Sequence, residues 1–427
     1  MHSKYRKFFA ICQGFSAPNV YYISAFMGKI ILFLLLLSIF ACSPLRPLGP
    51  DKAPSPTPEE PQRKSEPEIE PEPETKEVEP EKDERRDSVK SGIINVGIAF
   101  EKKSAKVQCP EKNWEFKAGA KKGKTEIESK GNCSYSGKTY RGSFAVLSTD
   151  SGLAVINTLD MEDYLKGVVV HEIGKLKIDG FEALKAQAVA ARTYAYSHLG
   201  SRKSQGFDVY ADTRDQVYNG KNDEDSLVNK AIEATSGIVI KHNGNLIEAY
   251  YHSTCGGNTE TPETWMKEGK PYLVSVKDSA GGRAFCEVSR YTKWEEKFSK
   301  AELAKLFQKN APNARADKIF SFNKVEQIFI IEKFPSNRVK SLVVITDNGH
   351  FEVLGDRSRW LFQRNGKILP SSAFSIVNNK NDFTITGAGF GHGIGMCQMG
   401  AIERAKAGQS FDEILKAYYT GVTIEVY

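Results

Sequence analysis

The chain has 427 residues, of which 40% are hydrophobic and 26% charged, values that are ordinary for a globular protein with room for two or three domains. The formal net charge is +5 for residues 1–50 and −6 for residues 51–90, which leaves +7 for residues 91–427 out of a total of +6. This mild excess suits an anionic polymer. It falls short of the dense Lys and Arg patches of a nucleic-acid binder, so we exclude nucleic acid as a partner.

The first segment predicts export. Residues 30–41 form an almost unbroken apolar run. The run is shorter than the roughly 20 residues that span a bilayer, and it is typical of a secretion signal. The run ends in Ser-Ile-Phe-Ala followed by Cys42, which resembles a bacterial lipobox, so residues 1–42 are interpreted as a lipoprotein signal with Cys42 as the lipidated residue. Met27 is an alternative start. An uncleaved anchor is the other interpretation, and both place the protein in the cell envelope, at the membrane, in the periplasm or on the outer face.

Residues 43–91 are rich in Pro and Glu, as in the run from Glu66 to Pro73. Proline fixes φ and removes hydrogen-bond donors, like charges repel, and little here is apolar. We therefore expect an extended, disordered tether that lets a folded part, residues 92–427, reach away from the membrane.

The folded part predicts an α+β fold with mixed sheets and packed helices, because its helices and strands do not alternate regularly. Residues 92–157 are expected to be β-rich, since apolar and polar residues alternate with period two. A helix over residues 181–199 carries a stripe of mostly small residues and is expected to pack closely. We expect a monomer. Further helices are predicted near 224–236, 299–309 and 410–419, and strands near 245–252, 325–332, 340–346 and 383–386.

One carboxylate stands out by its surroundings. Glu172 follows a buried-looking apolar run that begins at Tyr164 and is interpreted as a strand. A Glu among Val and Ile side chains is desolvated, which raises its pKa towards the range of a general acid and base. The structural alternative is an N-cap, an ion-pair partner or an exposed strand end.

Two further segments carry polar residues that a core alone does not require. On the helix at 181–199, Gln187 and Arg192 fall on the borders of the apolar stripe, and Arg192 either braces the fold or binds a substrate. Residues 387–401 have glycine at nearly every second position around His392. Glycines let a backbone adopt φ > 0 and approach a ligand, so this block indicates a site or, alternatively, a tight structural loop.

Five blocks, in this order, closely resemble the SpoIID/LytB domain family. The resemblance covers residues 91–427, nearly all of the folded part. The blocks are Met161–Val169 followed by Glu172, Ala183–Tyr194, Gln216–Tyr218, Glu248–Gly257, and the glycine-rich block 387–401 with its Gly-His-Gly-x-Gly-Met-x-Gln core.

The resemblance implies a peptidoglycan lytic transglycosylase that cleaves the β-1,4 bond after N-acetylmuramic acid, forms a 1,6-anhydro ring and prefers glycan strands already stripped of peptides by an amidase. The essential Glu of the family corresponds to Glu172, and His392, Gln398 and Arg192 are expected to bind the substrate. One carboxylic acid suffices, because the C6 hydroxyl of the sugar replaces water as the nucleophile.

One departure from the family is local. The family usually has Ser-Glu-Met-Pro where this chain has His171, Glu172, Ile173 and Gly174. The second hypothesis is therefore a non-catalytic wall-binding module that enhances a partner N-acetylmuramoyl-L-alanine amidase. A third is a zinc hydrolase built on His252 and the cysteines.

Two pairs of cysteines lie close in the sequence beyond the leader, Cys109 with Cys133 and Cys255 with Cys286. In an oxidising envelope both pairs are expected to form disulfides, and free thiols are an alternative for Cys255 and Cys286. No cofactor is assigned, although some relatives are thought to hold zinc near the His-Ser-Thr block, and His252, Cys255 and Cys286 are the alternative zinc ligands. Cys397 occupies a position where the family normally has Ser and is interpreted as a small, partly buried replacement.

Overall fold

The computed structural model describes residues 92–119 and 122–427. The chain divides between Glu79 and Pro80, and every described residue falls in the second unit. The predicted signal segment, its lipidation residue Cys42, the alternative start Met27 and the tether at 43–91 lie outside the described residues. Within the described part, no helix is long and apolar enough to cross a membrane.

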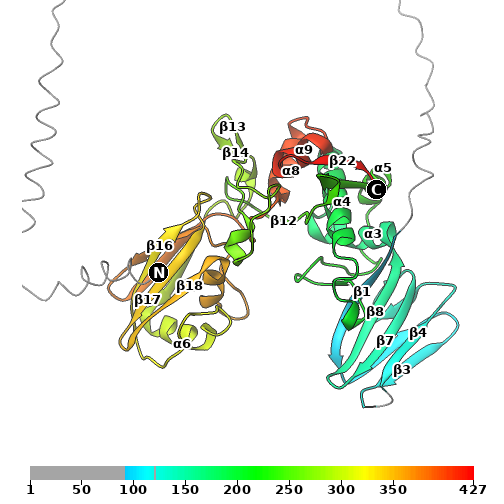
Figure 1. Cartoon of the computed structure of the whole chain (residues 1–427), viewed down its shortest axis with the longest axis horizontal. Helices are drawn as coiled ribbons and strands as arrows, with labels where there is room; N and C mark the ends of the chain where they lie inside the picture. The colour runs from blue at the N-terminus through cyan, green and yellow to red at the C-terminus, as the bar shows by residue number, and fades with distance from the viewer. Residues whose placement is uncertain (1–91, 120–121) are drawn as a thin grey trace, which may run out of the picture. The chain divides into compact units, whose positions relative to one another are not determined.

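The part that begins the described chain is made of two sheets (Figure 1). One has five strands in the order β4-β7-β8-β1-β9, and the other has four in the order β3-β2-β5-β6. Within the first, β1 is antiparallel to β8 and parallel to β9, so the start of the domain pairs with a strand that follows the main helices. The bounds are β1 Ile93–Lys102, β2 Ser104–Gln108, β3 Asn113–Lys117, β4 Gly123–Ile127, β5 Cys133–Tyr135, β6 Lys138–Tyr140, β7 Ser143–Thr149, β8 Gly152–Asp160 and β9 Val209–Tyr210.

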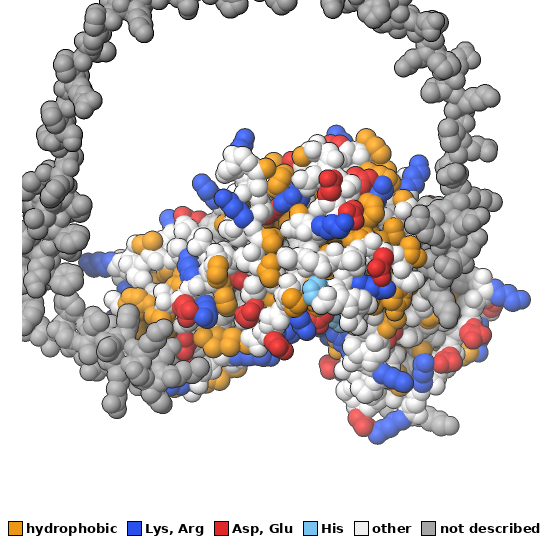
Figure 2. All heavy atoms as spheres, turned by 45° about the horizontal axis from the view of Figure 1, so that its top comes forward, with side chains coloured by type: hydrophobic (Ala, Val, Ile, Leu, Met, Phe, Trp, Pro, Cys, Tyr) orange, Lys and Arg blue, Asp and Glu red, His pale blue; other side chains and the backbone are white. Residues whose placement is uncertain are grey.

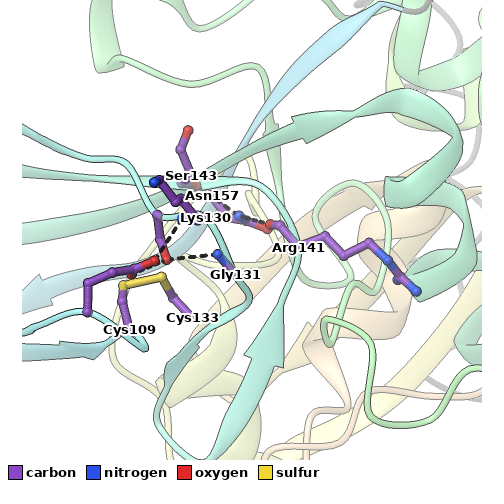
Figure 3. The surroundings of a disulfide bond; sticks show 9 residues. Cys109, Lys130, Gly131, Cys133, Arg141, Ser143 and Asn157 are labelled. Atoms are coloured by element: carbon purple, nitrogen blue, oxygen red, sulfur yellow. Dashed lines mark hydrogen bonds between the residues drawn. A yellow bond between two sulfur atoms is a disulfide. The ribbon is translucent and has the colours of Figure 1, made fainter.

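The predicted disulfide between Cys109 and Cys133 is confirmed (Figure 3). It links the end of β2 to the start of β5, and both strands belong to the four-stranded sheet. Nearby, the buried Asn157 of β8 donates from Nδ2 to the carbonyls of Arg141 and Ser143 at 2.9 and 3.0 Å. These bonds attach the loop before β7 to the strand that leads into the first helix.

Three helices follow, and the middle one is almost wholly buried. They are α3 Met161–Glu172, α4 Phe181–Ser197 and α5 Ser226–Ala234. Thirteen of the 17 residues of α4 are buried, including six fully enclosed alanines, so the small side chains permit close approach on nearly every side. Close approach also explains Gly167 in α3, where a Cβ would lie 2.5 Å from the carbonyl oxygen of Gly220.

The remaining elements of this first core come from distant parts of the chain (Figure 1). Strand β12 pairs in parallel with β21, which brings Tyr251 opposite Met396 and His252 opposite Cys397. Helix α8 starts directly after β21, so this two-stranded pairing fixes where α8 begins. The bounds are β10 Ile238–His242, β11 Asn245–Leu246, β12 Tyr251–His252, β21 Met396–Cys397, α8 Gln398–Lys406, α9 Phe411–Tyr418 and β22 Thr423–Val426.

A second hydrophobic core lies between residues 294 and 387. It is built from two three-stranded sheets, in the orders β15-β20-β19 and β16-β17-β18, together with α6. The bounds are β15 Trp294–Ser299, α6 Lys300–Asn310, β16 Val325–Lys333, β17 Val339–Thr346, β18 Gly349–Leu354, α7 Ser358–Leu361, β19 Phe374–Asn378 and β20 Asp382–Gly387. A short hairpin, β13 Ser279–Ala280 and β14 Arg283–Ala284, precedes it, and 3-10 turns occur at Ile178–Gly180, Lys203–Gln205, Pro262–Trp265, Phe285–Val288 and Gly355–Arg357.

The predicted α+β class is confirmed, and so are the β-rich start and the helices near 181–199, 224–236, 299–309 and 410–419. The expected strand near 245–252 is reduced to two strands of two residues, β11 and β12. The strand expected after Tyr164 is wrong, because these residues form α3. Asp160 caps that helix, and Val168, Val169 and Val170 are all buried, so tertiary packing outweighs their preference for strands.

On the face shown in Figure 2, Lys and Arg side chains are interspersed with Asp and Glu side chains. This mixture agrees with the mild net charge of the folded part.

Candidate active site

Glu172 is the last residue of α3. The helix begins at an Asp160 cap, whose Oδ1 accepts the Glu162 N–H at 2.8 Å, and acidic side chains occupy its first turn. At the other end the helix stops at Ile173, and Gly174 adopts a left-handed φ of 84°. A carboxylate at a helix C-terminus faces the negative end of the helix dipole, which disfavours its charged form.

The Glu172 carboxyl is partly buried, and its pKa is raised to about 7. Desolvation is the main cause, and it is opposed by hydrogen bonds from the Val217 N–H and from the Gln398 side chain. The Val217 N–H donates to Oε1 at 2.7 Å, which fixes the orientation of the carboxyl. A group with this pKa populates both its protonated and its ionised form near neutral pH, so it can donate and accept a proton.

Two buried tyrosines and a glutamine lie beside the carboxyl. Tyr164 OH donates to Gln216 Oε1 at 3.0 Å, and Gln216 Nε2 donates to Tyr251 OH at 2.9 Å. Burial raises the pKa of both phenols, and the charge of Glu172 raises them further. Both tyrosines therefore remain neutral and form a low-dielectric, hydrogen-bonded wall behind Glu172.

Gln398 lies next to Glu172, and its predicted role in substrate binding stays a prediction. It is the first residue of α8 and is buried. Its Nε2 donates to Gln187 Oε1 at 3.3 Å, and its side chain also bonds Glu172. The Nε2 atom of Gln187 is buried without a hydrogen-bond partner among the described residues, so the site contains an unused amide donor.

Arg192 has no exposed surface. Its Nε and Nη2 donate to the two carboxylate oxygens of Glu162 at 2.6 and 2.7 Å, and its remaining donors reach the carbonyls of Ile232 and Ile238. The bidentate pair ties α4 to the first turn of α3, and the bonds to the two carbonyls tie α4 to α5 and β10. The contacts favour the bracing interpretation, and the expected substrate contact stays a prediction.

His392 lies in an aromatic cluster. Its ring centroid is 4.8 Å from that of Trp265, 5.6 Å from that of His252 and 6.3 Å from that of Tyr250. Its Nδ1 accepts the Ile394 N–H at 3.0 Å, and burial lowers its pKa to about 4, so the imidazole is neutral at neutral pH. His392 does not contact Glu172 directly, but it also bonds the backbone of Tyr251, which lies beside Glu172. Its predicted role in substrate binding remains a prediction.

The glycines around His392 have a packing role. Gly389, Gly391, Gly393 and Gly395 all have positive φ. A Cβ on Gly395 would collide with the Tyr250 carbonyl oxygen, and one on Gly393 would collide with the Arg338 guanidinium. These positions need glycine whether or not a ligand binds.

Of the residues that replace the usual family pattern beside Glu172, His171 has a contact that the structure shows. His171 Nε2 lies 3.6 Å from a carboxylate oxygen of Asp223, and burial lowers the pKa of His171.

The sequence did not single out Tyr164, Gln216 or Tyr251 as site residues. Each of them stands inside one of the five resembling blocks, and that is the signal that would have found them.

The three other cysteines in the described part of the chain, Cys255, Cys286 and Cys397, are free and buried. The expected Cys255–Cys286 disulfide is wrong for this structure, because the two sulfurs are 3.5 Å apart and unbonded. Cys397, expected to be partly buried, is fully buried beside them. His252 is not in this group: its Nδ1 donates to the Ile394 carbonyl at 3.1 Å, and Asp278 takes the fourth place around the thiols.

Known proteins are similar to this chain over most of the described part. Residues 149–242 match the family described as Stage II sporulation protein, and residues 286–395 match a domain of unknown function, DUF8618. An uncharacterized protein of Brachyspira hyodysenteriae is 33% identical over 303 residues, which cover 70% of this chain and 76% of that protein.

Two relatives from Bacillus subtilis have descriptive names. The amidase enhancer is 31% identical over 293 residues, 62% of this chain, and the match spans only 40% of the enhancer's length. Stage II sporulation protein D is 28% identical over 287 residues, which cover 63% of this chain and 75% of that protein. With the family match across α3, α4 and the elements that hold Glu172, these likenesses show that the chain belongs to the SpoIID family.

Proposed function

We propose that this protein acts on the bacterial cell wall as a peptidoglycan lytic transglycosylase, with Glu172 as its single acid and base. The observation that carries the proposal is the Glu172 carboxyl, which is oriented by the Val217 N–H and has a pKa of about 7. No other carboxylate is among the groups that shift this pKa. A reaction that needs only one carboxyl therefore fits the site.

In the proposed reaction, protonated Glu172 gives its proton to the bridging oxygen between N-acetylmuramic acid and N-acetylglucosamine, and the bond from that oxygen to the muramyl C1 breaks. The C6 hydroxyl of the same sugar then bonds to C1, and ionised Glu172 takes the hydroxyl proton. The carboxyl ends protonated, as it began, and no water is consumed. Neutral Tyr164 and Tyr251 keep the surroundings of the carboxyl at low dielectric during both steps.

The second candidate is a wall-binding module that enhances an N-acetylmuramoyl-L-alanine amidase. The observation that favours it is the likeness to the amidase enhancer of Bacillus subtilis. The chain also has His171, Ile173 and Gly174 around the carboxyl in place of the usual family residues. A glycan-binding surface with an inactive carboxyl would serve this function.

The experiment that separates the two uses the purified full chain with intact and amidase-stripped peptidoglycan, and it identifies soluble products by mass spectrometry. We expect anhydro-muramyl products from stripped strands, and kcat/KM should fall as pH rises above about 7 because the acid form is lost. The Glu172→Gln variant should release none. Glu233→Gln, the same change at an exposed position of α5, is the matched control and should release products normally.

Absence of release by the unmodified protein, with binding to the wall retained, would contradict the transglycosylase proposal and support the second candidate. The enhancer function then predicts that added protein accelerates a cell-wall amidase, and that Glu172→Gln accelerates it equally.

We also propose that the chain is an envelope lipoprotein anchored through Cys42. Support comes from the apolar run at 30–41 and from the lipobox-like residues at its end, directly before Cys42. Labelling cells with a fatty-acid analogue should mark the protein, and Cys42→Ser should abolish the label. An unlabelled, unprocessed protein would contradict this anchor.

A further inference from the structure

Four buried side chains with metal-binding atoms meet in one place. Cys255 follows β12, Asp278 and Cys286 flank the β13–β14 hairpin, and Cys397 ends β21. Their sulfur and oxygen atoms all lie within 4.8 Å of one another, and each residue is at most 1% exposed. Three distant segments thus converge on a cluster that solvent does not reach.

Two distances within the cluster match the edges of a tetrahedral metal site. Cys255 Sγ is 3.5 Å from Cys286 Sγ and 3.4 Å from Asp278 Oδ2. With zinc–sulfur bonds of about 2.3 Å and zinc–oxygen bonds of about 2.0 Å, the edges of a tetrahedral site are about 3.5–3.8 Å. A disulfide requires a much shorter separation, about 2.05 Å between sulfurs.

Backbone groups around the cluster donate hydrogen bonds to its sulfur atoms, as they do around thiolate ligands of metal ions. Backbone N–H groups point at the sulfurs: that of Gly257 donates to Cys255 Sγ at 3.3 Å, and those of Cys255 and Gly400 donate to Cys397 Sγ at 3.2 and 3.3 Å. Such donors stabilise sulfur in its ionised form, which is the form that binds metal.

Two side chains outside the cluster hold the Asp278 carboxylate in place. Arg404 Nε donates to Oδ1 at 3.1 Å, the Tyr418 hydroxyl lies 3.0 Å from both Oδ1 and Oδ2, and Oδ2 is also 3.4 Å from Cys255 Sγ. The charge of Arg404 also offsets the negative charge that three thiolates and a carboxylate would retain around a divalent cation.

We propose that Cys255, Cys286, Cys397 and Asp278 bind one zinc ion in a closed, structural site. All four tetrahedral positions are filled by protein, so the site has no open position for a substrate. The ion would tie the loop after β12 and the β13–β14 hairpin to the residue that immediately precedes Gln398. It would thereby hold the start of α8 against Glu172, an effect on function that rests on the transglycosylase proposal.

The test measures metal in the full chain without relying on catalysis. Protein purified without chelators should contain one zinc per chain by elemental analysis, and all three thiols should resist alkylation until a strong chelator removes the ion. Cobalt exchanged into the site should give the intense sulfur-to-metal absorption of a thiolate complex. These measurements use the unmodified protein, so they hold even if cysteine variants do not fold.

Variants then identify the ligands. Cys286→Ser should lose the zinc, and Asp278→Asn should lower zinc affinity by at least about 10-fold. His252→Gln is the control that separates this ligand set from one containing His252, and it should keep the zinc. Protein that takes up no zinc or cobalt, or that carries a Cys255–Cys286 disulfide when isolated from the envelope, would overturn the proposal. Loss of zinc in His252→Gln with its retention in Cys286→Ser would do the same. Absent wall cleavage with zinc present would count only against the transglycosylase.

Discussion

For Glu172, the sequence predicted the apolar environment and the raised pKa of the carboxyl, but not its secondary structure or its hydrogen-bond partner. Its apolar neighbours predicted desolvation and a raised pKa, and both are confirmed. Its placement after a strand was wrong, and the helix adds a reason for the shift that the sequence argument lacked, since the carboxyl ends α3 at the negative pole of its dipole. The hydrogen bond from the Val217 N–H, 45 residues away, could not be inferred locally.

The raised pKa makes Glu172 a source of pH-dependent instability. The native carboxyl, with a pKa of about 7, keeps its proton at pH values where the unfolded one, near 4.5, has lost it. Stability is therefore highest below the unfolded value and falls as pH rises through 7. Glu172→Gln removes this cost, and we expect it to stabilise the protein by about 1–3 kcal/mol more at pH 8 than at pH 4.

Urea unfolding at both pH values measures this difference. Glu233→Gln, on the exposed side of α5, should show little change between them. An equal effect of Glu172→Gln at both pH values would mean that burial does not raise the carboxyl pKa.

At the scale of elements, α4 was predicted well and the residues that join it to its neighbours were predicted poorly. Its boundaries and its small-residue stripe follow from local pattern. The partner of Arg192 does not, because Glu162 is 30 residues away and the pairing depends on how α3 and α4 pack. Gln187 and Arg192 were expected at a half-buried border and are fully buried, since α4 is covered on nearly all sides.

We expect the Arg192–Glu162 pair to stabilise the protein and to leave substrate binding unaffected. Arg192→Lys loses the bidentate geometry and should cost about 1–3 kcal/mol of unfolding free energy. A double-mutant cycle with Glu162→Gln should give a coupling of about 1–3 kcal/mol, because the two groups bond each other directly.

The alternative role is tested in the same variants. Where Arg192→Lys remains folded, KM for stripped glycan should equal that of the unmodified protein. A raised KM with unchanged stability would instead assign Arg192 to the substrate.

The glycine-rich block allows strain and steric collision to be separated. Gly395 and Gly408 have left-handed φ values of 70° and 87°, but only at Gly395 would a Cβ collide with backbone, at the Tyr250 carbonyl. Gly408→Ala should therefore cost about 1–2 kcal/mol for conformation alone. Gly395→Ala should cost more, roughly 3 kcal/mol or above, because β12 and β21 must also move apart.

Thermal unfolding of both variants gives this comparison. Equal losses would show that the loop relaxes around the added methyl group. Close packing between β12 and β21 would then not explain why this position of the block is glycine.

For the whole molecule, the fold class, the β-rich start and the exclusion of a regular strand–helix alternation were available from the sequence. The existence of a second hydrophobic core was not. Its elements at 299–309, 325–332, 340–346 and 383–386 were predicted individually, but periodicity does not reveal which elements share a core. The cysteines are a second example. The Cys109–Cys133 disulfide, between residues close in the sequence, was predicted, whereas the contact of the Cys255 N–H with Cys397 Sγ spans 142 residues and was not.

Arg338, at the edge of the second core, reaches residues of the first. It is fully buried, and its guanidinium donates to the carbonyls of Asn258 and Cys255 at 3.1 and 3.0 Å. Arg338→Met keeps the apolar stem but leaves both carbonyls unpaired, and we expect a loss of about 2–4 kcal/mol in unfolding free energy. Because the lost bonds join the two cores, the second core should then unfold separately.

Hydrogen exchange resolves this by segment. In Arg338→Met, amides of β16–β18 should exchange faster while those of α4 keep most of their protection. Arg357→Met is the matched control, since its guanidinium bonds the Asn313 carbonyl within the second part of the chain, and it should not uncouple the two regions. Uniform loss of protection across both cores in Arg338→Met would show that they unfold as one cooperative unit even without this arginine.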